Sequence, residues 1–249
     1  MSDSLKWRVM NRLPWRFWGP IYRLRDAFAS PAERFRRSQA GQGTYVDPTV
    51  QVFGYENVHI GQNACISEWT LLNASRRGEF NDSITIGSFS HIGRRNFFST
   101  GGSIEVGHYG MTGMDCHFLG CGHDTSSPLR PYISTGLTPG APIVLEDNCW
   151  LTTSVTVHQG VRIGRGSVIG ARCVIRKDVP PFSIVAGHLA GLRRRFDFKN
   201  NVWTDIANWV DNLEDYMPTA EQYKALLDES RGDLRPPLHA SSTRFGWLR

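Results

Sequence analysis

The chain has 249 residues, 40% of them hydrophobic and 20% charged, and a formal net charge of +5 at pH 7. Residues 1–43 hold nine Lys or Arg against three Asp or Glu, so the positive charge belongs to this arm and the rest of the chain is close to neutral. No apolar run approaches the roughly 18 residues of a membrane span, no signal-peptide core precedes a cleavage site, and no basic stripe outside the arm suits nucleic acid.

Residues 1–43 predict an arm of short helices that is interrupted at Pro14 and at Gly19 to Pro20. Aromatic residues and arginines are interleaved along it: Trp7, Arg8, Arg12, Trp15, Arg16, Phe17, Trp18, Tyr22, Arg23, Arg25 and Phe28. Such pairs suit an anionic bilayer surface and predict peripheral contact with the inner face of the membrane. The alternative is that the arm packs across the open end of the following domain as a cap.

From Leu145 to Pro180 an aliphatic residue recurs at every sixth position without a break. These residues are Leu145, Leu151, Val157, Ile163, Ile169 and Ile175. Helices repeat at 3.6 residues and strands at two, so a period of six indicates short strands separated by regular corners and stacked into a solenoid. Each repeat of such a tube buries its aliphatic residue against its neighbours.

The fifth position of each six-residue repeat is small or β-branched, as a narrow three-sided tube requires. It holds Cys149, Val155, Val161, Ser167, Cys173 and Val179. Glycine recurs at the second position, as in Gly164 and Gly170, where we expect it to ease the backbone round a corner. The frame extends upstream to Val46, with Thr112 as a polar inward residue, and predicts about six coils of three repeats each.

Two segments break this frame. The first is a short polar bulge between Leu72 and Ile86. The second, residues 119–144, is rich in proline and glycine and cannot continue a strand ladder, so it predicts a loop extruded from the tube. Insertions into solenoids are common places for functional residues.

The predicted organisation is therefore an arm (1–43), a solenoid domain (44–191) that carries the loop, and a helical C-terminal extension (192–249). In the extension, helical spacing from Ile206 to Leu213 predicts one helix. A capping box formed by Thr219 and Gln222 predicts the start of a second.

Three segments around the loop form a recognisable series: Gly122 and His123 open the loop, GAPIVLEDNCWL (140–151) returns to the coil, and VIGARCVIRKDVPPFSIVAG (168–187) ends it. In these segments the sequence resembles the hexapeptide-repeat acyltransferases, a family that includes maltose, galactoside and nodulation-factor O-acetyltransferases. This resemblance implies a mainly β, left-handed parallel β-helix and a homotrimer with its active site between protomers. It also implies acetyl-CoA as the acyl donor and direct O-acetyl transfer to a sugar or glycan acceptor.

His123 is the candidate general base, because a neutral imidazole can take the proton of an alcohol as the alcohol attacks a thioester. By resemblance, a backbone amide near Thr152 and Thr153 faces the oxyanion of the tetrahedral intermediate. The resemblance also places the acetyl-CoA arm along the last coils, with Lys and Arg near its phosphates. The candidates for binding this substrate are Trp150, Thr152, Thr153, Gly170, Ala171, Arg176, Lys177 and Arg194.

Departures from the family pattern concern the acceptor. The chain reads Gly187 to Ala190 where many relatives close the coil with GNPA, and Ser99 to Gly102 lacks the acidic residues that maltose and galactoside enzymes carry there. A different sugar hydroxyl, such as that of a surface polysaccharide or glycolipid precursor, is therefore expected. The candidate contacts are Asp115, Asp124, Arg130 and Tyr132. Transfer to the amine of an amino sugar is an alternative, because the same base could support it.

Two further classes stay open. The γ-type carbonic anhydrases share the tube and bind zinc through three histidines, and His91, His117 and His123 all take the sixth position of their repeats. Their spacing differs from that of the anhydrases, so no metal is expected. A catalytically silent scaffold on the same fold is the other class.

Cysteine usage bears on the compartment. Cys116, Cys149 and Cys173 occupy inward positions, where a free thiol behaves as a compact apolar group. A reducing, cytoplasmic location is therefore expected, rather than a disulfide framework.

Overall fold

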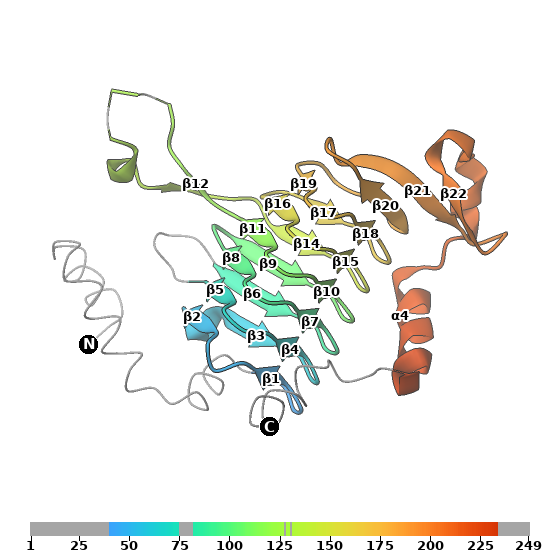
Figure 1. Cartoon of the computed structure of the whole chain (residues 1–249), viewed down its shortest axis with the longest axis horizontal. Coiled ribbons are helices and arrows are strands. Elements are labelled where there is room, and N and C mark those ends of the chain that lie inside the picture. The colour runs from blue at the N-terminus through green and yellow to red at the C-terminus, as the bar shows by residue number, and fades with distance from the viewer. Residues whose placement is uncertain (1–39, 75–81, 127, 130, 234–249) are drawn as a thin grey trace, which may run out of the picture.

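Three parallel sheets form the faces of a triangular tube (Figure 1). The computed structural model describes residues 40–74, 82–126, 128–129 and 131–233, so the predicted arm lies outside the described residues except for residues 40–43. The chain visits the three faces in turn, and successive coils stack in parallel along the tube. The predicted mainly β, parallel β-helix is confirmed.

Each face is a ladder of short strands. The first face holds β1 (Tyr45–Val46), β4 (Cys65–Ile66), β7 (His91–Ile92), β10 (Met111–Thr112), β15 (Trp150–Leu151), β18 (Val168–Ile169) and β20 (Ser183–Ala186). The second face holds β2 (Gln51–Phe53), β5 (Leu71–Asn73), β8 (Phe97–Ser99), β11 (His117–Leu119), β16 (Thr156–His158) and β19 (Val174–Ile175). The third face holds β3 (Val58–Ile60), β6 (Ser83–Ile86), β9 (Ser103–Val106), β14 (Ile143–Leu145) and β17 (Arg162–Ile163). We number the coils from one to seven by their strands on the first face, in chain order.

Three edges join these faces, and we name them by their residues. The first edge, between the first and second faces, comprises residues 47–50, 67–70, 93–96, 113–116, 152–155 and 170–173. The second edge leads from the second to the third face and carries the 3-10 helix Tyr55–Asn57 and, in coil four, the loop of residues 120–142. The third edge returns to the first face and comprises residues 61–64, 87–90, 107–110, 146–149 and 164–167. The loop therefore leaves the tube at the second edge.

Side chains of the predicted aliphatic repeat fill the tube. All six repeat residues from Leu145 to Ile175 are at most 3% exposed, and the fifth-position residues between Cys149 and Val179 are at most 6% exposed. Upstream, the rings of Phe98 and Phe118 stack with their centroids 4.2 Å apart. Burying each large side chain is worth about 1.5–3 kcal/mol, so this column holds the coils together.

The corners use glycine differently from the expectation. Left-handed backbone falls at the fourth position, on non-glycine residues with φ between 51° and 61°: Asn63, Trp69, Phe89, Arg95, Tyr109, Asp115, Asn148, Ser154 and Arg172. Second-position glycines have no such φ. A Cβ on Gly87 would instead lie 2.4 Å from the carbonyl carbon of Gly107 in the next coil. Glycine is required there because adjacent coils approach too closely for a side chain.

The C-terminal extension begins with strands rather than a helix. β21 (Gly191–Asp197) pairs antiparallel with β20, and β22 (Val202–Asp205) pairs with β21, so the hairpin covers the free edge of the first face. The segment from Ile206 to Leu213, expected to be helical, forms the 3-10 turns Ile206–Asn208 and Asp211–Tyr216, separated by extended backbone at Trp209 and Val210.

Helix α4 (Ala220–Glu229) packs along the third edge of the tube. The predicted capping box of Thr219 and Gln222 opens it, and the 3-10 turn Ser230–Asp233 follows it. Asn148 Nδ2 donates a 2.6 Å hydrogen bond to the Tyr223 hydroxyl, and the Tyr109 hydroxyl bonds to Asp228. None of the described helices is long and apolar enough to cross a bilayer.

Candidate active site

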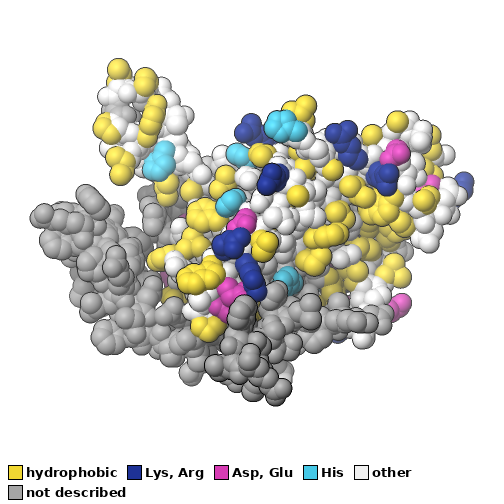
Figure 2. Space-filling view, in the orientation of Figure 1, with side chains coloured by type: hydrophobic (Ala, Val, Ile, Leu, Met, Phe, Trp, Pro, Cys, Tyr) yellow, Lys and Arg dark blue, Asp and Glu magenta, His cyan; other side chains and the backbone are white. Residues whose placement is uncertain are grey.

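The extruded loop projects from coil four as a narrow hairpin (Figure 1). Its stem pairs β12 (Gly122–His123) antiparallel with β13 (Leu137–Thr138), which places His123 opposite Leu137. A 3-10 turn, Tyr132–Ser134, forms the far part, where Ile133 is 92% exposed. Figure 2 shows hydrophobic side chains along this projection. His123 is itself exposed, so its imidazole is accessible to a substrate.

The root of the loop is built from glycines that lie backbone to backbone. Gly120 N–H donates to Ser99 O at 2.8 Å, and Gly140 N–H donates to Gly101 O at 2.6 Å. A Cβ on Gly140 would lie only 1.6 Å from the carbonyl oxygen of Gly120. Both ends of the loop are thereby fixed to each other and to coil three, which sets the position of His123.

Thr152, Thr153, Gly170 and Ala171 come together on the first edge, in coils five and six. Backbone hydrogen bonds run along this edge from coil to coil, including Ser154 N–H to Met114 O at 2.8 Å and Arg172 N–H to Thr153 O at 2.9 Å. Strands about 4.8 Å apart set the spacing of the coils. The four candidates therefore form one continuous stretch of edge.

Two backbone amides on this stretch are available to a ligand. Thr153 and Ala171 are exposed, and their N–H groups donate to no acceptor in the part of the chain that the structure describes. Each precedes a left-handed residue, Ser154 or Arg172, as the second residue of a tight turn. Such outward amides can bind a carbonyl oxygen or an oxyanion.

The other candidates for acetyl-CoA contacts lie apart from these amides. Trp150 is on the first face beside the first edge and is 43% exposed. Arg176 and Lys177 lie past β19, at the second edge of coil six, and line a pocket of about 430 Å³ at the open end of the tube. Arg194 lies on β21 and its Nε is 2.8 Å from Asp205 Oδ1. One protomer thus does not bring these cations to the amides of Thr153 and Ala171.

The acceptor candidates are dispersed as well. Asp115 lies on the first edge of coil four in a two-pronged pair with Arg95, at 2.7 and 2.8 Å, and these hydrogen bonds lower the pKa of its carboxyl. Asp124 lies in the loop, where its carboxylate accepts a 2.9 Å hydrogen bond from the Ser126 N–H. This hydrogen bond lowers the pKa of the Asp124 carboxyl. Tyr132 lies on the far turn of the loop, 48% exposed, and Arg130 is outside the described residues.

The three histidines of the zinc alternative do not converge. His91 lies on the first face, His117 on the second beside Phe97, and His123 in the loop. Across the described ranges, no group of three or more His, Cys, Asp or Glu side chains could hold a metal ion. Within one copy of the chain these three histidines therefore form no metal site.

Buried thiols line the tube. Cys116, Cys149 and Cys173 are fully buried and free, as expected of small inward residues. Burial raises the pKa of Cys116 to about 11 and that of Cys149 to about 12, so both thiols stay protonated and unreactive.

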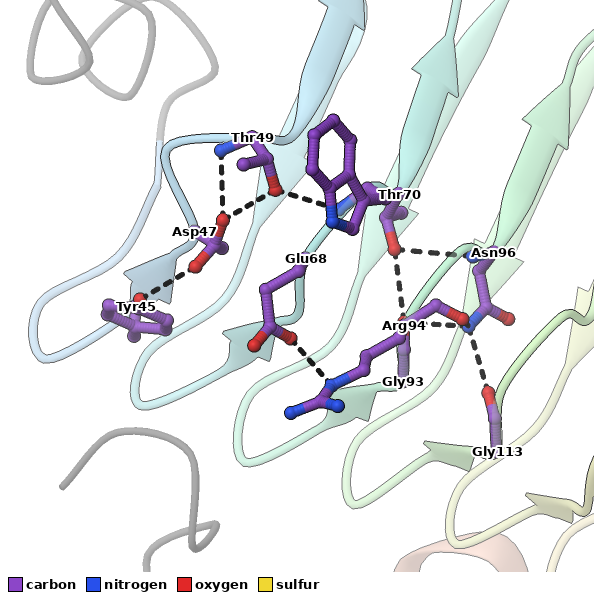
Figure 3. A network of polar contacts seen from close by, with 10 residues as sticks. Tyr45, Asp47, Thr49, Glu68, Thr70, Gly93, Arg94, Asn96 and Gly113 are labelled. Atoms are coloured by element: carbon purple, nitrogen blue, oxygen red, sulfur yellow. Dashed lines mark hydrogen bonds and ion pairs between the residues drawn. The ribbon is translucent and has the colours of Figure 1, made fainter. Parts of the chain in front are cut away.

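A polar part of the first edge was not anticipated from the sequence. Glu68 and Arg94 form an ion pair at 3.0 Å in neighbouring coils (Figure 3). Beneath them the buried Asn96 side chain donates to Gly93 O at 2.7 Å and to Gly113 O at 2.9 Å. Residues that take the same outward position in successive coils lie side by side on one edge. Aligning the six-residue repeats would therefore have placed Glu68 beside Arg94.

The family model described as "Bacterial transferase hexapeptide (six repeats)" matches residues 142–177. A putative acetyltransferase of Schizosaccharomyces pombe is 35% identical over 94 residues, which are 38% of this chain and 44% of that protein. An acyl-[acyl-carrier-protein]–UDP-N-acetylglucosamine O-acyltransferase of Aliarcobacter butzleri is 28% identical over 204 residues, 78% of this chain and 68% of that protein. The chain thus spans 44% of the length of the first relative and 68% of the length of the second.

Among solved structures, the N-acyltransferase AntD of Bacillus cereus, in complex with dTDP-4-amino-4,6-dideoxyglucose and coenzyme A, shares the fold. Its TM-score is 0.55 at 17% identity, over 80% of this chain and 97% of that one. The repeat frame, the stacked coils and the matched family segment agree with one another. Residues 142–177 are thus similar to the bacterial hexapeptide transferases, and the tube as a whole has the fold of AntD.

Proposed function

We propose that the protein transfers the acetyl group of acetyl-CoA to a sugar hydroxyl, with His123 as the general base. This proposal rests on the order in which His123 and the two outward amides follow one another along the axis of the tube. His123 enters from coil four, and the outward amides of Thr153 and Ala171 follow in coils five and six. A thioester held by those amides would end beside the base.

These groups lie on different edges of one tube, because His123 belongs to the second edge and the amides to the first. A homotrimer whose axis runs parallel to the tube removes this separation. In such a ring, the second edge of one copy faces the first edge of the next at the same coil level. Exposed apolar side chains beside the first edge suit such a contact: Met111, Met114, Trp150 and Val174 are 39% to 43% exposed.

The same ring accounts for the dispersed cations. The second edge of a neighbouring copy would bring Arg176 and Lys177 to coil six, across from Ala171 of the first copy. There they suit the phosphates of acetyl-CoA, whose arm would follow Gly170 and Ala171. Arg194 is a weaker candidate, since Asp205 already pairs with it.

The chemistry follows from this placement. The acceptor oxygen forms a bond to the thioester carbon while its proton passes to the imidazole of His123. The carbonyl electron pair moves onto oxygen, where the Thr153 amide stabilises the charge. When the carbonyl re-forms, the carbon–sulfur bond breaks and the thiolate takes the proton from His123. The products are an acetylated sugar and free coenzyme A.

Incubation with isotopically labelled acetyl-CoA and a panel of sugars, glycans and nucleotide sugars tests the proposal. We expect an acceptor-dependent mass gain of one acetyl group that is removed by mild alkali, as an ester is. An alkali-stable product would support the alternative of N-acetylation of an amino sugar. Absence of both acetyl-CoA binding and transfer would contradict the enzyme proposal and favour a scaffold.

A further inference from the structure

We propose that Trp69 is the stacking platform for a neutral sugar ring of the acceptor, with the adjoining Glu68–Arg94 and Arg95–Asp115 pairs hydrogen-bonding the ring hydroxyls. This assignment rests on the proposed function and specifies where along the shared groove the acceptor lies. The acceptor candidates chosen from the sequence do not include this tryptophan.

Trp69 lies on the same edge as the donor amides but at a different level along the tube. It lies on the first edge in coil two, the same edge that carries Thr153 and Ala171 in coils five and six. His123 enters at coil four, so donor and acceptor must approach this level from opposite ends. At about 4.8 Å per coil, Trp69 lies about 10 Å from the level of His123, on the side away from the donor amides.

Trp69 is unusually exposed for a tryptophan. Its side chain is 66% exposed, although an indole of this size is usually buried. Its backbone is held rigidly, with φ of 60° and with its N–H donating to Thr49 Oγ1 at 2.8 Å. A flat apolar ring on a fixed backbone at the surface, whose indole N–H meets no acceptor among the described residues, suits the carbon–hydrogen face of a pyranose.

Two ion pairs lie beside Trp69 on the same edge. Glu68 and Arg94 are 3.0 Å apart, and Arg95 and Asp115 form two hydrogen bonds to each other. All four side chains retain some exposure, so they can donate to and accept from hydroxyl groups beside the ring. Because the charges cancel, this stretch offers no net attraction to a diphosphate. It favours a neutral glycan over a nucleotide sugar.

The chain itself supplies conservative substitutions for the test. Asn63, Asn148 and Phe89 occupy the equivalent left-handed corner position in other coils. Trp69→Asn therefore removes the ring without straining the corner, and Trp69→Phe keeps an aromatic ring. Tyr216→Ala, which removes an exposed aromatic residue on the C-terminal extension, serves as the matched control.

Saturation-transfer NMR of the full-length protein with three neutral disaccharides that are neither maltose nor galactosides (cellobiose, chitobiose and laminaribiose) measures acceptor binding without any turnover. We expect at least one sugar to bind, about tenfold more weakly to Trp69→Asn, and nearly normally to Trp69→Phe and Tyr216→Ala. Binding of acetyl-CoA and the oligomeric mass should not change in any variant.

Unchanged sugar binding by Trp69→Asn would overturn the platform, and so would a loss of oligomeric mass in that variant, which would make Trp69 a subunit contact. If the wild type binds none of the three sugars, the platform is overturned as well. If the wild type still binds and turns over acetyl-CoA in that case, the proposed function stands without the platform. If it does neither, the proposed function fails independently.

Discussion

The substitution Gly140→Ala tests whether the glycine root of the loop positions His123. The new Cβ would lie 1.6 Å from Gly120 O and 2.8 Å from Gln159 Oε1. Real Cβ atoms essentially never come within 3.0 Å of such an atom, so one strand of the root must move by about 1.4 Å or more. A misplacement of about 1 Å at a catalytic group typically costs about 100-fold in rate.

We therefore expect kcat to fall about 100-fold in Gly140→Ala, while the melting temperature and the affinity for acetyl-CoA stay close to those of the wild type. The aliphatic column inside the tube is untouched, which is why stability should persist. Steady-state kinetics with the best acceptor, together with thermal unfolding, provide the measurement.

Gly122→Ala is the matched control, because it adds the same methyl group to the same hairpin. Its Cβ would meet only Thr138 Oγ1, at an ordinary 3.6 Å. We expect kcat within a few-fold of the wild type. Equal rates in Gly140→Ala and Gly122→Ala would refute the idea that this root sets the position of the base.

Three other predictions concern the base, the core and the C-terminal helix. His123→Ala should lower turnover by about 100-fold to 10,000-fold with an unchanged circular dichroism spectrum, and near-normal turnover would remove His123 from the mechanism. Phe98→Ala should cost about 3–5 kcal/mol in chemical denaturation, since the ring is fully buried against Phe118, whereas Phe97→Ala on the outer surface should cost far less. Hydrogen bonds from Tyr109, Arg231 and Lys224 hold the pKa of Asp228 well below its usual range, so the stability that this carboxylate contributes is present above about pH 4 and lost as the pH falls further. The difference in urea midpoint between wild type and Asp228→Asn should therefore shrink as the pH is lowered from 6 to 3, and a constant difference would show that these hydrogen bonds do not stabilise the native state.

The period of six was sufficient to predict the tube, because a residue that points inward at every sixth position leaves few alternatives for the backbone. The buried repeat from Leu145 to Ile175 and the capping box at Thr219 were found in the sequence for this reason. The left-handed corners were not, since Trp69, Arg95 and Arg172 carry no local signal for positive φ. Stacking of neighbouring coils imposes that conformation, and a single repeat does not reveal it.

The site was predictable only in its parts. His123 and the stretch from Thr152 to Ala171 were chosen from the sequence as site candidates, but the sequence did not show that they lie on different edges of the tube. Which edge a residue lies on depends on how many residues separate it from the inward-pointing residues of its coil. That count becomes clear only once the coils are aligned. The hairpin of β21 and β22 escaped prediction because its pairing partner, the free edge of β20, exists only in the folded tube.

Mixed oligomers test most directly whether His123 of one copy serves the Thr153 edge of another. Thr153→Pro deletes the amide at a turn position that favours proline, and the chain already holds Pro181 before the left-handed Phe182. His123→Ala and Thr153→Pro should each be nearly inactive alone. After unfolding and refolding together in equal amounts, a site shared between copies in a ring should regain about a quarter of wild-type activity, since about one interface in four then combines an intact base with an intact amide. No recovery in verified mixed oligomers would contradict a site shared between subunits.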